Sequence, residues 1–188
     1  MHGKLHQKQD VIDALLRTRE IHHDIYVIGS QECMRNIAHA VIAPSKDKWE
    51  STLKAQLGEE FPMIASFSLG ATHLAVFAHI SITPIISNVE SECIATGINN
   101  TVGNKGAVSV RFNVGRTKVL CICSHLAAGQ NGTERRNEDF DKIYKKFVLQ
   151  VPETTRSEVG CLGIYGSKKQ DETSSIVPAK KNMVVALS

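Results

Sequence analysis

The sequence predicts an α/β fold of the α+β type, because amphipathic helical segments flank a long run of strand-like segments. Residues 24–32 contain the run Ile-Tyr-Val-Ile, apolar on both faces as in a central strand that is covered on each side. Five strand-like segments then follow one another between residues 63 and 125, which favours antiparallel neighbours because parallel pairs need long crossovers. Residues 133–149 carry apolar side chains at helical spacing.

The first third of the chain is predicted to run helix, strand, helix. Residues 9–22 place apolar side chains on one helical face, and the strand at 24–32 follows. Pro44 interrupts the chain, and Ser45 can cap a helix that ends at Gly58. The apolar positions of that helix are Trp49, Leu53 and Leu57.

The strand-like segments are residues 63–69, 74–79, 89–97, 107–114 and 117–125. Gly70 and Ala71 are suited to a turn between the first two, and residues 113–116 to a hairpin between the last two. The helix at 133–149 has a stripe of large apolar residues that should pack on the sheet, namely Phe140, Ile143, Tyr144, Phe147 and Val148.

The chain divides into one domain at residues 1–150 and a tail at 151–188. After Pro152 the sequence is rich in Ser, Thr, Lys, Glu and Gly, and its apolar stretches at 161–165 and 183–187 are short. We expect a poorly ordered tail, in which such a stretch can form a strand.

Composition excludes several classes of protein. With 188 residues, 42% hydrophobic, the chain can bury a core and is not disordered. A net charge of +3 from 22 basic and 19 acidic residues is too small for a generic nucleic-acid binder. No apolar run approaches the roughly 20 residues of a membrane helix, and the N-terminus lacks the apolar core of a signal peptide. Five cysteines are an odd count, so we expect a cytoplasmic protein without a disulfide framework, in which Cys121 and Cys123 are small buried strand residues.

Four features can carry chemistry. Glu32 ends an apolar strand, where α/β proteins place ligand sites, and a carboxylate there suits Mg²⁺ or is merely solvated. His125 ends another apolar strand and can donate a hydrogen bond to a phosphoryl oxygen or act as an acid or base, or it is a partly buried histidine bonded to backbone. Asn104 and Lys105 lie in a Gly-Asn-Lys-Gly loop that suits phosphate or is a plain turn. Residues 135–137, Arg-Arg-Asn, begin a helix at a position that favours an anion or simply faces solvent.

Taken together and in order, these motifs resemble the inositol polyphosphate 5-phosphatase family of the endonuclease/exonuclease/phosphatase superfamily. The matching segments are Gly-Ser-Gln-Glu at 29–32, Gly-Asn-Lys-Gly-Ala-Val at 103–108, Ser-His-Leu-Ala-Ala-Gly at 124–129 and Glu-Arg-Arg-Asn at 134–137. The resemblance extends from about residue 24 to about residue 147. It implies part of a sandwich of two β-sheets flanked by helices, mainly its first sheet.

The resemblance also implies Mg²⁺-dependent removal of the 5-phosphate from phosphoinositides or inositol polyphosphates. Glu32 is similar to the metal-ligating glutamate, and His125 resembles the catalytic histidine beside the scissile phosphate. Asn104 and Lys105 match the loop that borders the substrate phosphates. Arg135, Arg136 and Asn137 match a helix start that is substrate-binding or structural.

The chain also departs from the family pattern. A Trp-Asn-x-Asn strand, a Gly-Asp-x-Asn motif that activates the attacking water, a Pro-x-Trp-Cys-Asp-Arg segment and a Ser-Asp-His motif are all missing. We therefore expect a truncated domain with impaired catalysis, because parts of an active site act as a unit. We also expect an uncovered apolar sheet face, and with it a chain that alone is unstable, self-associating or dependent on a partner.

Two alternatives to a 5-phosphatase stay open. One is a non-catalytic fragment that binds phosphoinositides, peripherally at membranes, or binds partner proteins. The other is a nuclease of the same superfamily, which the Lys105 loop and the Ala-Ala-Gly turn at 127–129 argue against.

Overall fold

The computed structural model describes residues 16, 23–31, 46–97, 105–149, 159–160 and 183–187. The helices are α3 (Lys46–Leu57) and α4 (Thr133–Tyr144), with a 3-10 turn η1 (Thr83–Ile85) and a π-helical turn η3 (Lys145–Leu149). The strands are β1 (Ile25–Gln31), β2 (Met63–Leu69), β3 (Thr72–Ala78), β4 (Ile86–Ala95), β5 (Gly106–Val114), β6 (Thr117–His125), β7 (Val159–Gly160) and β8 (Met183–Leu187). Of the helix predicted at residues 9–22, only Leu16 is among the described residues, and it is helical and buried.

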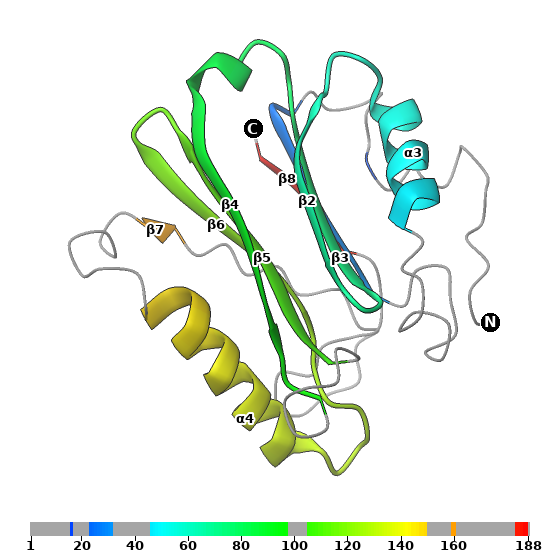
Figure 1. Cartoon of the computed structure of the whole chain (residues 1–188), viewed down its shortest axis with the longest axis vertical. Helices are drawn as coiled ribbons and strands as arrows, with labels where there is room; N and C mark the ends of the chain where they lie inside the picture. Colours follow the sequence, from blue (N-terminus) through cyan, green and yellow to red (C-terminus); the bar gives the residue numbers. More distant parts are fainter. Residues whose placement is uncertain are drawn as a thin grey trace, which may run out of the picture.

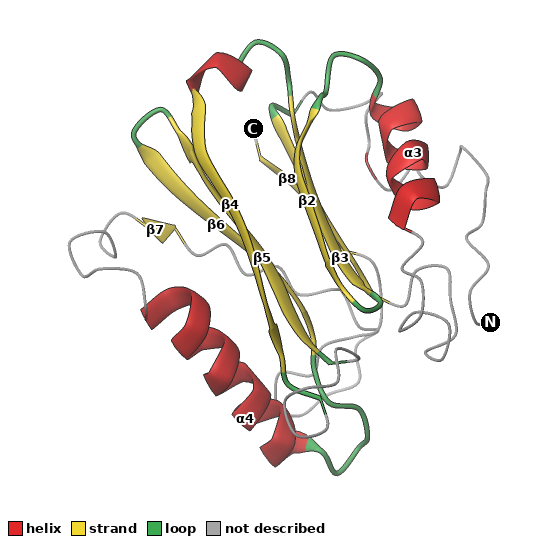
Figure 2. Cartoon of the chain, viewed as in Figure 1, coloured by secondary structure: helices red, strands yellow, loops and turns green. Residues whose placement is uncertain are grey.

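The strands form two four-stranded sheets that face each other, with α3 outside one and α4 outside the other (Figure 1, Figure 2). Sheet A has the order β2-β3-β1-β8, and sheet B has the order β4-β5-β6-β7. Every pairing is antiparallel except that of β6 with β7. The predicted α/β class and two-sheet sandwich are confirmed, and the described strands are divided equally between the two sheets.

The predicted turns are found where glycine permits them. Gly70 (φ +56°) lies in the turn between β2 and β3, and Gly115 (φ +58°) lies in the turn between β5 and β6. Gly58 (φ +77°) follows α3 and donates its amide hydrogen to the carbonyl of Lys54, which ends the helix as expected.

One connection differs from the prediction of five successive antiparallel neighbours. β3 and β4 do not pair: η1 carries the chain from sheet A to sheet B between them. Pro84 and its neighbours form this turn, and the hydrophobic pattern of the flanking strands did not distinguish a change of sheet from a hairpin.

The inner faces of the two sheets bury each other. Val27 and Val76 of sheet A and Val108 and Phe112 of sheet B belong to one core cluster, with each side chain at most 5% exposed. The expectation that one inner face lacks cover is therefore wrong for this part of the molecule, because the chain contains strands of both layers. Cys123 joins this cluster, with Cys121 packed against it, on the same side of β6 as predicted, and burial raises the pKa of the Cys121 thiol to about 12.

Each outer face carries one helix. Trp49, Leu53 and Leu57 of α3 pack on the outer face of sheet A. Ile143 and Phe147 pack on the outer face of sheet B. The predicted stripe on α4 is too wide, since Phe140 and Tyr144 are 56% and 41% exposed and stack on each other at the surface. The buried positions are four residues apart, and they include Asp139.

A polar cluster lies buried beneath α3. The Glu50 carboxylate accepts hydrogen bonds from Ser66 Oγ at 2.6 Å and from His73 Nε2 at 3.0 Å. Burial lowers the pKa of His73, and the hydrogen bond and negative charge of Glu50 offset only part of this effect. Burial acts to raise the pKa of Glu50, but the hydrogen bonds from Ser66 and His73 and the nearby positive charge outweigh it, so that this pKa is lowered.

No helix among the described residues is both long enough and apolar enough to cross a bilayer.

Candidate functional site

The candidate site lies at the edge of the sandwich where β6 ends and β5 begins. His125 is the last residue of β6, and the strand register places it opposite Gly106, the first residue of β5. Lys105 directly precedes β5, so the two predicted site residues become neighbours although 20 positions separate them in the sequence.

Lys105 and His125 form a hydrogen bond, with 2.5 Å between Nζ and Nε2. A lysine ammonium group has only donors, so Nε2 of His125 must be the acceptor in this contact. Both side chains are partly exposed, and together they offer a positive charge and a titratable nitrogen to an incoming anion.

Backbone contacts hold Lys105 in place. The amide hydrogen of Thr96 is donated to the carbonyl of Lys105 at 2.9 Å, which joins the end of β4 to the start of β5. Gly106 (φ +145°) is required here, because a Cβ atom would lie 2.0 Å from the carbonyl oxygen of Ile94. Gly106, the second glycine of the Gly-Asn-Lys-Gly loop, therefore lets β4 approach the start of β5 closely. Asn104 lies outside the described residues.

β1 ends at the same edge, although it belongs to the other sheet. Gln31, its last residue, donates a side-chain hydrogen bond from Nε2 to the carbonyl of Ser124, the residue before His125. Glu32 lies outside the described residues, and its role as a metal ligand stays a prediction. Its chain neighbour Gln31 is at the edge that carries His125 and Lys105, as the sequence analysis requires.

The start of α4 is organised around the loop that follows His125. Arg136 donates from Nη1 to the carbonyl of Gly129 at 2.7 Å and from Nη2 to Thr133 Oγ1 at 3.2 Å. Arg135 and Asn137 are exposed on the first turn. The structure therefore gives Arg136 a partner within its own loop, and the substrate-binding role of these three residues stays a prediction.

Sequence reasoning missed two residues of this region. Asp139 is 1% exposed, and its Oδ2 accepts a hydrogen bond from the backbone N–H of Ala127 at 3.0 Å. Gln31 belongs to the Gly-Ser-Gln-Glu segment at 29–32, but no role of its own was predicted for it. A carboxylate on the face of α4 that also carries Ile143 and Phe147 was the available signal for Asp139.

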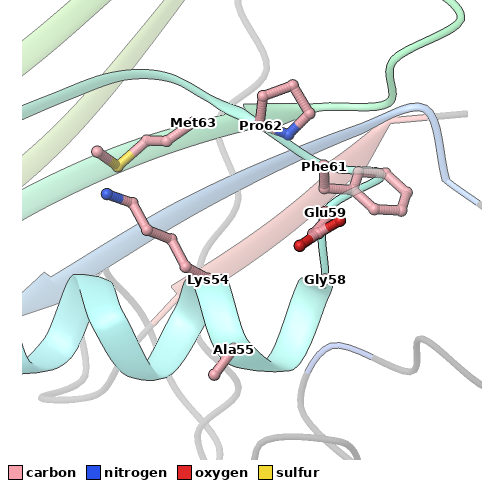
Figure 3. A pocket seen from close by; sticks show the side chains of 7 residues that line it. All are labelled: Lys54, Ala55, Gly58, Glu59, Phe61, Pro62 and Met63. Atoms are coloured by element: carbon pink, nitrogen blue, oxygen red, sulfur yellow. The ribbon is translucent and has the colours of Figure 1, made fainter.

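The described residues contain no group of three or more His, Cys, Asp or Glu side chains placed to hold a metal ion. A pocket of about 450 Å³ lies elsewhere, between α3 and the start of β2 (Figure 3), and its lining consists of Lys54, Ala55, Gly58, Glu59, Phe61, Pro62 and Met63. β2 starts at Met63, opposite Phe77, whereas Gln31 lies opposite Thr72. The pocket is therefore at the far end of sheet A from His125.

Comparisons with known proteins agree with this arrangement. A family model described as "Endonuclease/Exonuclease/phosphatase family 2" matches residues 1–186, and so includes the predicted tail. Inositol-1,4,5-trisphosphate 5-phosphatase 1 of Schizosaccharomyces pombe is 38% identical over 129 residues, a match that covers 64% of this chain and 12% of that protein. Human synaptojanin-1 is 33% identical over 133 residues, covering 68% of this chain and 8% of that protein.

A solved structure shows the same fold. It is the inositol polyphosphate 5-phosphatase domain of SPsynaptojanin in complex with inositol (1,4)-bisphosphate and a calcium ion. The match has a TM-score of 0.61 and 31% sequence identity, and it covers 77% of this chain. The chain spans 42% of the length of that domain.

Proposed function

The chain belongs to the endonuclease/exonuclease/phosphatase family and is a partial inositol polyphosphate 5-phosphatase domain, and from this we propose that its site binds and hydrolyses the 5-phosphate of phosphoinositides or inositol polyphosphates. The observation that supports this most directly is the contact between Lys105 and His125. A phosphate dianion that enters between them gains the charge of Lys105. It also meets an imidazole that can take up a proton and then donate a hydrogen bond to the phosphoryl oxygen.

We propose Mg²⁺ as the cofactor. Mg²⁺ keeps several waters and is held by one or two carboxylates together with substrate phosphate oxygens. Glu32 follows Gln31 in the sequence, and Gln31 lies at the edge that carries His125 and Lys105, so the carboxylate of Glu32 is the ligand we propose for this ion. When bound, the ion neutralises charge on the phosphate and on the attacking oxygen. The residues of the chain bind and orient the phosphate.

We further propose that turnover by this chain is weak. In-line attack on phosphorus needs an oriented water as well as charge neutralisation. The Gly-Asp-x-Asn and Ser-Asp-His motifs of the family are missing from the sequence. Loss of several parts that act as a unit removes nearly all of the rate.

The test is phosphate release from soluble inositol phosphates and from lipid vesicles that carry a 5-phosphorylated phosphoinositide, with and without Mg²⁺. We expect slow release that falls further in His125→Ala and Glu32→Gln, and no change in His79→Ala at the far end of β3. Rapid release that both site variants abolish would show that the chain is a competent enzyme. Equal release by all four proteins would refute the site assignment.

The alternative is a non-catalytic fragment that binds phosphoinositides at a membrane surface in the cytoplasm or binds a partner protein. The Lys105–His125 contact supports the first of these as well, because it recognises phosphate whether or not hydrolysis follows. Co-sedimentation with phosphoinositide vesicles, against phosphatidylserine vesicles of equal charge, separates specific binding from simple attraction. Preference for the phosphoinositide that Lys105→Ala removes, without phosphate release, would favour this alternative. Sedimentation of the chain alone tests self-association.

A further inference from the structure

Two backbone groups close to His125, one before it and one two residues after it, are held by side chains from other layers of the molecule. On the N-terminal side, the carbonyl of Ser124 accepts a hydrogen bond from Gln31 of sheet A. On the C-terminal side, the N–H of Ala127 donates to Asp139 of α4 at 3.0 Å. His125 is thus fixed from sheet A and from α4, while its own strand belongs to sheet B.

The burial of Asp139 indicates that this contact has a purpose other than packing. Asp139 is 1% exposed, and it shares a face of α4 with Ile143 and Phe147, which are 5% and 0% exposed. Burying a carboxylate is costly unless hydrogen bonds compensate. An apolar residue would pack on this face at no such cost, so what the carboxylate adds is a hydrogen bond to the loop after His125.

Gln31 of sheet A bonds to sheet B beside the apolar core cluster that both inner faces share. It is the last residue of β1, and the strand pairing aligns it with Thr72 of β3. Its amide reaches across to β6, so it sets the distance between the end of β1 and the end of β6. Because Glu32 follows Gln31, the same bond sets where the chain leaves β1 relative to His125.

We propose that Gln31 and Asp139 are positioning residues, which hold the imidazole of His125 against Lys105. The inference rests on the proposed function in so far as it assigns His125 to phosphate chemistry. It also makes a structural claim that does not depend on turnover. Removal of either hydrogen bond changes the position of the His125 ring relative to Lys105 and leaves the rest of the fold unchanged.

The test uses the full chain with isotope-labelled histidine, observed by NMR. The chain has eight histidines, and loss of one signal in His125→Gln assigns the relevant ring. Gln31→Met keeps the length of the side chain but removes the donor, and Asp139→Leu removes the acceptor. We expect each to shift the His125 ring signals while those of His73 and His79 stay in place.

Two conservative variants keep the proposal falsifiable if a harsher one fails to fold. Asp139→Asn retains an acceptor oxygen and should restore the His125 signals, whereas Gln31→Glu replaces the donor by an acceptor that faces a carbonyl and should not. Matched controls are Asp141→Leu, on an exposed position of α4, and Gln56→Met, on α3. If His125 signals stay unchanged in Gln31→Met and Asp139→Leu, or change equally in the controls, the proposal is overturned.

A titration with a soluble 5-phosphorylated inositol phosphate separates this inference from the proposed function. We expect the ligand to shift the His125 signal of the unmodified chain, with affinity about tenfold weaker in Gln31→Met and Asp139→Leu. If the ligand leaves His125 unaffected while the variants still move its signal, the positioning role holds and the proposed function fails. If the ligand binds all variants equally and their His125 signals coincide, the positioning role fails and the proposed function stands.

Discussion

His73 and Glu50 are buried beneath α3 and make the stability of the fold depend on pH. Both have a pKa that is lowered in the folded state, His73 because of burial and Glu50 because of its hydrogen bonds. The unfolded chain therefore binds protons at a higher pH than the folded chain does. The contribution of these lowered pKa values to the free energy of unfolding is present in full above the unfolded pKa of each group. It is lost as the pH falls from the unfolded pKa through the folded pKa.

We expect the free energy of unfolding to fall as the pH decreases from about 7 to about 5. A single histidine contributes a slope of at most about 1.4 kcal/mol per pH unit in the range between its folded pKa and its unfolded value near 6.5. Urea unfolding at a series of pH values measures this slope. It should become shallower in His73→Gln, which keeps a donor for Glu50 but does not titrate. Ser66→Ala leaves His73 in place, so this variant should keep the slope of the unmodified chain. Identical slopes in the unmodified chain and in His73→Gln would contradict the assignment.

At the scale of the elements, the local pattern predicted most of what the structure shows. The strand at β1 is recognisable from its short run that is apolar on both faces, and the helix from Thr133 from its apolar residues at helical spacing. The two hairpins are recognisable because their turns contain Gly70 and Gly115. The change of sheet at η1 was not recognised, since it depends on which surface covers β4 and not on the residues of the turn.

Gly106 joins β4 to β5 at closer range than any other residue type allows. In Gly106→Ala the new methyl group would lie 2.0 Å from the carbonyl oxygen of Ile94. In Gly115→Ala the methyl group meets no atom within 4 Å, so only the left-handed backbone conformation is penalised, by about 1–2 kcal/mol.

We expect Gly106→Ala to reduce the free energy of unfolding by about 2 kcal/mol more than Gly115→Ala does, since an overpacked site costs about 1–3 kcal/mol in addition to backbone strain. Thermal or urea unfolding of the two variants measures the difference. Equal losses would mean that β4 moves away from β5 without cost.

For the molecule as a whole, the inter-sheet core is where the two sheets bury each other, so we expect it to contribute strongly to stability. Phe112 lies in this core at 1% exposed, whereas Phe140 of α4 is 56% exposed. We expect Phe112→Ala to cost about 3–5 kcal/mol and Phe140→Ala less than about 1 kcal/mol. Urea unfolding compares the two deletions of the same side chain. A large loss in Phe140→Ala would show that the exposed ring is covered in solution, which sedimentation would then reveal as self-association.

The candidate site was predictable in part. Lys105 was found because it lies in a Gly-Asn-Lys-Gly loop, and His125 was found because it ends an apolar strand. Gln31 and Asp139 were missed because each acts through one hydrogen bond to the backbone of a residue distant in sequence or in another element. The order of residue types along the chain does not indicate such a bond, because the bond forms only when the two sheets and α4 pack together.

The pairing of β1 also affects how the chain is made on the ribosome. β2 with β3 and β5 with β6 are joined by two-residue turns, and such hairpins form within microseconds of emerging. β1 leaves the exit tunnel before all of these strands, yet it pairs with β3, where Ile25 lies opposite Ala78, and with β8, where Ile25 lies opposite Leu187. It is apolar on both faces, and among the described strands it waits the longest for its neighbours, so of these strands it is the most exposed to aggregation and to chaperones. The yield of folded protein therefore depends on how β1 is protected during synthesis and not only on the stability of the finished sandwich.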